Sequence, residues 1–165
     1  MSPGPNSVLL LGLGNDIMGD DGVALAAVQI LNKNKDIARD VDFSDTTEAG
    51  LALLDTMSPY DRVLILDSII TGKHPPGTIM ELSRGDFDKA LGPSPHYAGL
   101  PEVLELAKGL EIAFPHDIRI LAIEIEQCFD FRETLSPVIE QALPAFVEKA
   151  ASILRQWLEH PENTL

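Results

Sequence analysis

The sequence predicts a single α/β domain whose mostly parallel sheet carries helices on both faces. Two observations support this fold class. Continuously apolar runs of strand length alternate along the chain with stretches of helical periodicity, which is the pattern of strand–helix–strand units. The strongest runs also lack the alternation of a sheet that has one face in water, so both faces are expected to be covered. One domain is expected over residues 1–165, with tails at 1–6 and 160–165, because this length suits one hydrophobic core.

Five segments have the composition of strands. Val8–Leu13 is apolar throughout, and Asp61–Ile70 is the strongest strand pattern in the chain. Val41–Asp45 is a weaker candidate, and Asp117–Glu126 alternates well enough for a strand. Gly77–Leu82 follows a Pro-Pro-Gly turn and is expected at an edge of the sheet.

Helical periodicity is found in four segments between and after these strands, namely Asp20–Asn34, 48–57, Leu100–Leu110 and Leu135–His160. In the last of them, Ser136 is placed to cap the helix and Pro137 to occupy its first turn. Pro144 lies inside the pattern and predicts a kink or a break, because proline removes a backbone hydrogen bond and clashes with the preceding turn.

The composition excludes several classes of function. The formal net charge is −14, from 26 acidic and 12 basic residues. Such a charge repels nucleic acid and anionic lipid and favours cationic partners or metal ions, although solubility alone also accounts for it. No apolar stretch approaches the roughly 18 residues of a membrane helix, and the start MSPGPNS lacks the features of a secretory signal. We therefore expect a cytoplasmic protein with no nucleic-acid partner and no membrane partner.

Cysteine usage narrows the chemistry further. Cys128 is the only cysteine, so an intramolecular disulfide and a thiolate-rich zinc site are both excluded. A lone cysteine with apolar neighbours is more often inert than nucleophilic.

The stretch GLGNDIMGDDG, Gly12–Gly22, follows the first strand and raises two alternatives. A dinucleotide-binding loop needs G-x-G-x-x-G, but the third glycine position is Ile17, and the loop carries three aspartates without a lysine or arginine. Those carboxylates would repel a pyrophosphate. A loop that aims carboxylates at a cation is the better match, with Asp20 and Asp21 at the start of a helix.

Two more candidate ligands lie where strand ends are expected to meet. Asp67 ends an apolar strand, where a carboxylate is costly unless it is paired or coordinated, and His96 lies in the turn-rich loop GPSPHYAG. Two carboxylates and an imidazole suit a borderline divalent metal such as zinc, nickel or cadmium. The alternatives remain open: Asp20 or Asp21 could cap a helix, Asp67 could bind backbone amides, and His96 could be an ordinary loop histidine.

Several motifs, in their order along the chain, resemble one known family. They are LGLGNDIMGDDGVAL, TTEAGLALLD, VLILDSII, PPGTI, SPHYAGLPEVL and LSPVIEQAL. Each motif is weak alone, but the ordered combination from Val8 to Leu158 resembles the hydrogenase maturation endopeptidases, which trim the C-terminus of the [NiFe] hydrogenase large subunit. The resemblance implies a three-layer α/β/α domain with a twisted five-stranded sheet.

The resemblance also implies a site and a substrate. The family's three metal-binding positions fall on Asp21, Asp67 and His96, which are the implied catalytic residues as well; at the first position this chain has Asp where relatives often have Glu. The implied partner is the large-subunit precursor, and the implied metal is nickel carried by that precursor, with zinc or cadmium able to occupy the same site. The protein is expected to act as a monomer. One departure is EIEQCFDF, Glu124–Phe131, where many members carry a proline-containing segment.

The chain offers no obvious nucleophile of its own. It has no Ser-His-Asp arrangement in a readable order and no H-E-x-x-H motif, and Cys128 lies away from the family motifs. This fits an endopeptidase that recognises its client's nickel through Asp21, Asp67 and His96. Two other functions stay open at this point: a metal-dependent hydrolase with its own bound ion, and a non-catalytic metal-binding module for hydrogenase assembly.

Overall fold

The computed structural model describes residues 4, 6–48, 51–83, 100–126 and 131–161. Within these residues the sheet has five strands in the order β2-β1-β3-β5-β4. The strands are β1 (Val8–Leu13), β2 (Asp42–Thr46), β3 (Arg62–Ile69), β4 (Ile79–Ser83) and β5 (Asp117–Glu124). The helices are α1 (Val23–Asn32), α2 (Lys35–Ala38), α3 (Leu51–Met57), α5 (Leu100–Gly109) and α6 (Pro137–Glu159), and a 3₁₀ turn, η1 (Gly19–Gly22), precedes α1.

The sheet is parallel except at one edge. β2, β1, β3 and β5 pair in parallel, while β4 pairs antiparallel with β5 and has no other partner in the sheet. The predicted edge strand is therefore confirmed, as is the prediction of a five-stranded, mostly parallel sheet. The carboxyl ends of the four parallel strands face one side, where sites form in folds of this kind.

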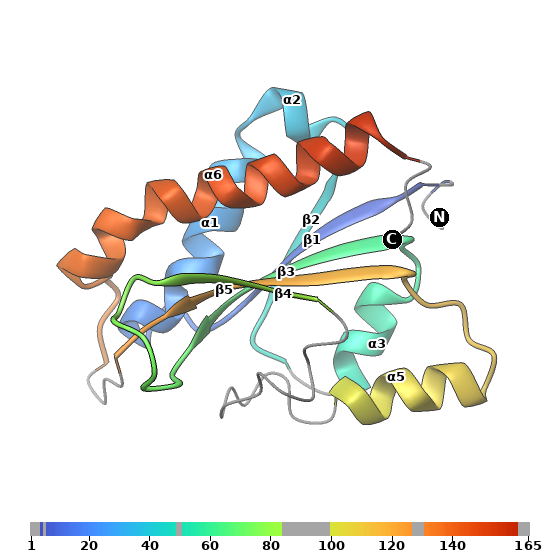
Figure 1. The fold of residues 1–165 in the computed structure, drawn as a ribbon, viewed down its shortest axis with the longest axis horizontal. Coiled ribbons are helices and arrows are strands. Elements are labelled where there is room, and N and C mark those ends of the chain that lie inside the picture. Colours follow the sequence, from blue (N-terminus) through green and yellow to red (C-terminus); the bar gives the residue numbers. More distant parts are fainter. Residues whose placement is uncertain (1–3, 5, 49–50, 84–99, 127–130, 162–165) are drawn as a thin grey trace.

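Helices cover both faces of the sheet and make three layers. Figure 1 shows α1 and α6 on one face, with α3 and α5 on the other. Because side chains alternate along a strand, Leu64 and Leu66 of β3 join the core under α1 and α6, while Val63 and Ile65 join the core with α3. The strands are buried on both faces, which explains their continuously apolar sequence.

Close packing of α1 on β1 requires a glycine. A Cβ at Gly12 would lie 2.8 Å from the Cγ2 atom of Val28 and 3.4 Å from the carbonyl oxygen of Ala24. With no side chain at position 12, α1 can lie directly on the sheet, and its start is brought to the carboxyl end of β1.

The last helix differs from its prediction in two ways. α6 runs without a break from Pro137 to Glu159, so of the kink or break predicted at Pro144, the break does not occur. Ser136 is the N-cap residue as predicted, but its hydroxyl makes no capping bond to the helix. Instead the hydroxyl donates to a carboxylate of η1, as described below. α2 was not predicted, because a four-residue element carries too little periodicity, and residues 20–22, predicted as the first turn of a helix, form part of η1. Of the helices that the structure describes, none is both long and apolar enough to cross a membrane.

At the amino edge of the sheet, which is the end where the parallel strands begin, charged side chains bind to groups of the same chain. The buried guanidinium of Arg62 donates to the carbonyls of Trp157, His160 and Pro161 at the end of α6. A cation suits this place, because the carbonyl end of a helix is negative. The carboxylate of Asp61 accepts hydrogen bonds from the backbone and hydroxyl of Ser7.

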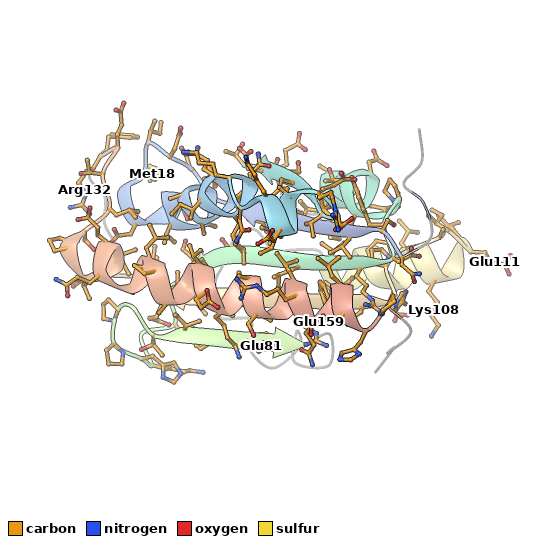
Figure 2. The ribbon with its side chains drawn as sticks, turned by 90° about the horizontal axis from the view of Figure 1, so that it is seen from above. Met18, Glu81, Lys108, Glu111, Arg132 and Glu159 are labelled. Carbon is orange, nitrogen blue, oxygen red and sulfur yellow. The ribbon has the colours of Figure 1, made fainter. Side chains whose placement is uncertain are left out.

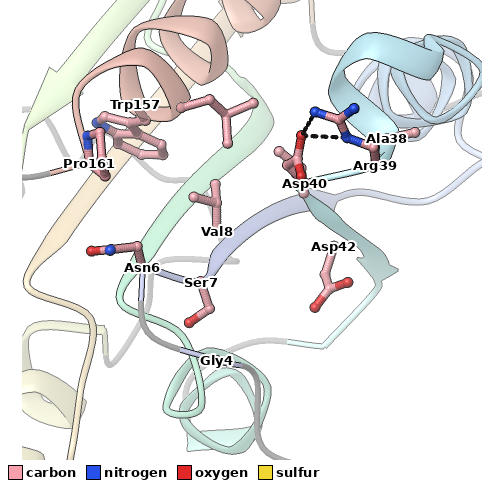
Figure 3. A pocket seen from close by; sticks show the side chains of 12 residues that line it. Gly4, Asn6, Ser7, Val8, Ala38, Arg39, Asp40, Asp42, Trp157 and Pro161 are labelled. Carbon is pink, nitrogen blue, oxygen red and sulfur yellow. Dashed lines mark hydrogen bonds and ion pairs between the residues drawn. The ribbon is translucent and has the colours of Figure 1, made fainter.

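A hollow of about 580 Å³ opens at this amino edge, between the start of β1, the segment before β2 and the end of α6. Figure 3 shows Arg39 bound to Asp40 on one side of the hollow and Trp157 on the other. The guanidinium of Arg39 lies 3.1 Å from the carboxylate of Asp40, so this charge is already paired. The hollow lies at the end of the sheet remote from Asp21 and Asp67.

Candidate active site

Glycine shapes the loop that follows β1. Gly14 has φ +151°, and a Cβ at this position would lie only 2.1 Å from the carbonyl oxygen of Asp21. The backbone of η1 thus returns to the end of β1 at a distance that no side chain at position 14 would allow. This close return places Asp21 over the carboxyl edge of the sheet.

Ser68 links the two predicted carboxylates. Its hydroxyl donates to Oδ1 of Asp21 at 2.8 Å, and its backbone N–H donates to Oδ1 of Asp67 at 2.8 Å. Asp21 comes from η1 and Asp67 from β3, so residues 46 positions apart in the chain meet at one serine. The structure therefore brings together two of the three predicted site residues.

Asp20 has a different role from its neighbour. Its carboxylate accepts the backbone N–H of Ser136 at 2.6 Å and the hydroxyl of Ser136 at 2.7 Å. The guanidinium of Arg132 lies 3.9 Å from the same carboxylate. Figure 2 shows Arg132 beside Met18, and these residues also form a β-bridge that ties the segment before α6 to the loop before η1. Asp20 thus joins η1 to the start of α6, which leaves Asp21 as the acid of this pair that faces Ser68.

The electrostatics of the edge favour a cation. Asp67 is fully buried and Asp21 is half-buried. A carboxylate in a partly dry place carries a desolvation cost, which a divalent ion beside it lowers. Carboxylate oxygens are ligands for hard and borderline divalent ions, so the donor set fits such an ion.

The third predicted ligand, His96, lies outside the described residues, as does Cys128. Among the residues that the structure does describe, no group of three or more His, Cys, Asp or Glu side chains could hold a metal ion. The described part of the site is therefore a pair of carboxylates, to which a metal-binding site would add a further ligand.

Sequence reasoning missed two buried polar residues at this edge. Ser68 is hidden in an apolar strand, and only its place directly after Asp67 in LDS could have drawn attention to it. Glu124 ends β5 and is 1% exposed; its carboxylate accepts the N–H and hydroxyl of Thr71 at 2.7 Å each and the N–H of Gly72 at 2.8 Å. Glu124 thereby fixes the loop between β3 and β4.

Fold and site together define an α/β protein with an acidic site at the carboxyl edge of its sheet. A model of the hydrogenase maturation protease family matches residues 25–153, a range that includes Asp67 and begins four residues after Asp21. Because this match covers most of the chain, the protein belongs to the hydrogenase maturation protease family. The predicted family is thereby confirmed.

Relatives and solved structures agree with this assignment. The hydrogenase expression/formation protein HoxM of Cupriavidus necator is 31% identical over 153 residues, which cover 91% of this chain and 75% of HoxM. The hydrogenase maturating endopeptidase HybD of Escherichia coli has a similar fold, with a TM-score of 0.75 and 25% identity over 91% of this chain and 93% of HybD. The [NiFe] hydrogenase maturation protease HybD of Thermococcus kodakarensis also has a similar fold, with a TM-score of 0.67 and 27% identity. The match covers 90% of this chain and 99% of that protein.

Proposed function

We propose that this protein is the endopeptidase that removes the C-terminal extension of a nickel-loaded [NiFe] hydrogenase large-subunit precursor. Asp21, Asp67 and His96 recognise the nickel that the precursor carries. The observation that carries the proposal is the pair of carboxylates linked through Ser68 at the carboxyl edge. Family membership supports the protease activity, and the names of the relatives support the hydrogenase as client.

In this proposal the metal belongs to the substrate. Asp21 and Asp67 supply negative oxygens that complete the coordination of an ion held by the precursor, and His96 supplies a nitrogen. Ser68 orients both carboxylates through its hydroxyl and its N–H. Zinc or cadmium suits the same donor set. A divalent ion near the scissile bond either polarises the carbonyl as a Lewis acid or activates a water as the nucleophile, and the chain offers no obvious nucleophile of its own.

Recognition through the client's own metal makes cleavage depend on metal insertion. A precursor without nickel lacks the charge that Asp21 and Asp67 would bind, so it is not held at the edge. The −14 charge of the chain adds a general attraction for a cationic site on the client. We expect the enzyme to act as a cytoplasmic monomer.

The test uses a purified large-subunit precursor with and without nickel, and mass spectrometry to detect shortening. Wild-type protein is expected to shorten only the nickel-loaded precursor. Asp21→Asn, Asp67→Asn and His96→Ala are expected to lower the rate at least about 100-fold, because each removes one ligand, a loss of roughly 3 kcal/mol of transition-state stabilisation. His116→Ala is the matched control, since His116 is exposed and lies at the amino edge.

Other outcomes would overturn the proposal in distinct ways. Cleavage of the precursor without nickel, by protein that purifies with a stoichiometric ion, would identify a hydrolase with its own metal. Binding of the precursor without any shortening would identify an assembly module. Normal shortening by His96→Ala would remove His96 from the mechanism.

A further inference from the structure

A second hollow lies beside the candidate site, on the α3 and α5 face of the sheet. It has a volume of about 370 Å³, and its apolar floor is formed by Ile69, Met80 and Leu82. Ile69 is two residues beyond Asp67 in β3, so both side chains point to the same face. Met80 and Leu82 pack against the same apolar cluster that contains Ile69.

The strand register connects this floor to Asp67. Asp67 pairs with Ala122 of β5, and Ala122 pairs with Met80 of β4, so the three residues form one row across the sheet. Two strand spacings separate the ends of the row, or about 10 Å, which is the length of roughly three residues of an extended peptide. Only the methyl group of Ala122 lies between them in this row.

The rim of the hollow is basic. Lys73 and His74 line it and are exposed. Glu81 also belongs to its lining, but Glu81 pairs with Leu121, which lies in the core on the α6 side, and its carboxylate binds Lys149 at 3.2 Å and Arg119 at 3.5 Å. Figure 2 shows Glu81 beside α6. The positive charge of the rim is therefore not cancelled by this carboxylate, although the chain as a whole is strongly acidic.

The loop that carries the rim is fixed from inside the sheet. The buried carboxylate of Glu124 accepts three hydrogen bonds from Thr71 and Gly72, directly before Lys73. The N–H of Lys73 in turn donates to the hydroxyl of Thr71 at 3.1 Å. Glu124 is thus a positioning residue for the basic rim, and a rim held in this way can discriminate between ligands at little cost in ordering.

We propose that this hollow is the specificity pocket for the client's C-terminal extension. It accepts an aliphatic side chain about three residues from the position held at Asp67, and Lys73 contacts an acidic side chain next to it. An apolar floor with a basic rim matches an aliphatic residue flanked by a carboxylate. This inference rests on the proposed function, since it assumes that the client is a peptide cleaved beside Asp67.

The test is a charge exchange between enzyme and precursor. A set of nickel-loaded precursors is prepared in which one of the first five positions of the extension is changed to Leu, Asp or Lys. The value of kcat/KM is measured on each precursor for wild type and for Lys73→Glu. At one position, wild type is expected to prefer Asp over Lys, and Lys73→Glu is expected to reverse this preference by about fivefold to tenfold, because an exposed attraction becomes a repulsion. Lys33→Glu, an exposed change at the end of α1, should leave the preference unchanged.

A second variant tests the floor. Met80→Gln is expected to raise KM for extensions with an aliphatic residue at the adjoining position, while kcat stays near the wild-type value. Two results would overturn the proposal of a specificity pocket. In the first, wild type cleaves the nickel-loaded precursors with no preference at any of the five positions. In the second, Lys73→Glu keeps the wild-type preference. If wild type cleaves no precursor at all, the proposed function fails instead, so the two failures are distinguishable.

Discussion

The two edges of the parallel sheet use buried charge in opposite ways. At the amino edge, the guanidinium of Arg62 donates from its two terminal nitrogens to three carbonyl groups of the same chain. At the carboxyl edge, Asp21 and Asp67 bring two like charges to one serine. The first arrangement closes the fold on itself, whereas in the proposed function the second receives the cation of the client. A buried charged residue is therefore informative about function only once its partners are known.

The same contrast exists within the carboxyl edge. Asp20 and Glu124 are buried, like Asp67, and each accepts two or three hydrogen bonds from a chain segment that it holds in place. Asp20 anchors α6, and Glu124 anchors the loop before β4. These two acids hold the segments around the site in place and are its frame, whereas Asp21 and Asp67 are the candidate ligands of the site.

The largest expected loss of stability follows from breaking the amino edge. Arg62→Met keeps a long apolar stem but leaves the carbonyls at the end of α6 without their donor. We expect the free energy of unfolding to fall by about 3 kcal/mol, because several hydrogen bonds from a buried charged group are lost together. Urea denaturation measures this change.

Arg155→Met is the control for that measurement. Arg155 lies on α6, the helix whose end is bound by Arg62. It pairs with Glu148 at 2.9 Å, but both side chains are largely exposed. Its removal should change stability by less than about 0.5 kcal/mol. Equal effects of the two variants would show that the guanidinium of Arg62 does not hold this edge. Processing of nickel-loaded precursor by the folded fraction should be normal in both.

A smaller effect on stability is expected at the frame of the site. Asp20→Ala removes the acceptor for the N–H and hydroxyl of Ser136, so the start of α6 loses its attachment to η1. The loss should be about 1–2 kcal/mol, as for other residues that bind the first N–H groups of a helix. Thermal unfolding measures the loss, and the precursor assay should show retained cleavage.

Asp21→Asn sharpens this comparison, because it changes the adjacent residue. We expect it to keep the melting temperature within a few degrees and to abolish cleavage. A result in which Asp20→Ala abolishes cleavage and Asp21→Asn does not would exchange the roles of the two acids.

Much of this division could be predicted from the sequence, and part could not. Apolar runs such as Val8–Leu13 predicted the parallel strands, because a continuously apolar strand is typical of a sheet that is covered on both faces. Asp67 stood out because it interrupts an apolar segment. The roles of Asp20 and Glu124 depend on partners that are 116 and 52–53 positions away in the chain, and no local pattern indicates such contacts.

Pro144 shows the opposite error. The local rule predicted a kink or a break, but α6 continues through Pro144 and packs its apolar face, including Phe146 and Ala150, into the core. Burial of that face outweighs the local cost of one proline, which is about 3 kcal/mol. Local rules thus fail where tertiary packing compensates for them.

The smallest expected effect returns to the amino edge. The pKa of Tyr60 is raised above its ordinary value by burial, and further by its hydrogen bond to Asp42 and by the negative charge of that carboxylate. The folded protein therefore keeps the phenol proton at a pH where the unfolded chain loses it, so this contribution to stability is complete below about pH 10 and is lost as the pH rises through the folded pKa. Because Tyr60 is only partly buried, the contribution should stay below about 1 kcal/mol.

Urea denaturation of wild type and Tyr60→Phe at pH 9 and at about pH 11 measures this contribution. Wild type should lose more stability between the two than the variant, and an equal loss would show that the phenol of Tyr60 is not held at this edge.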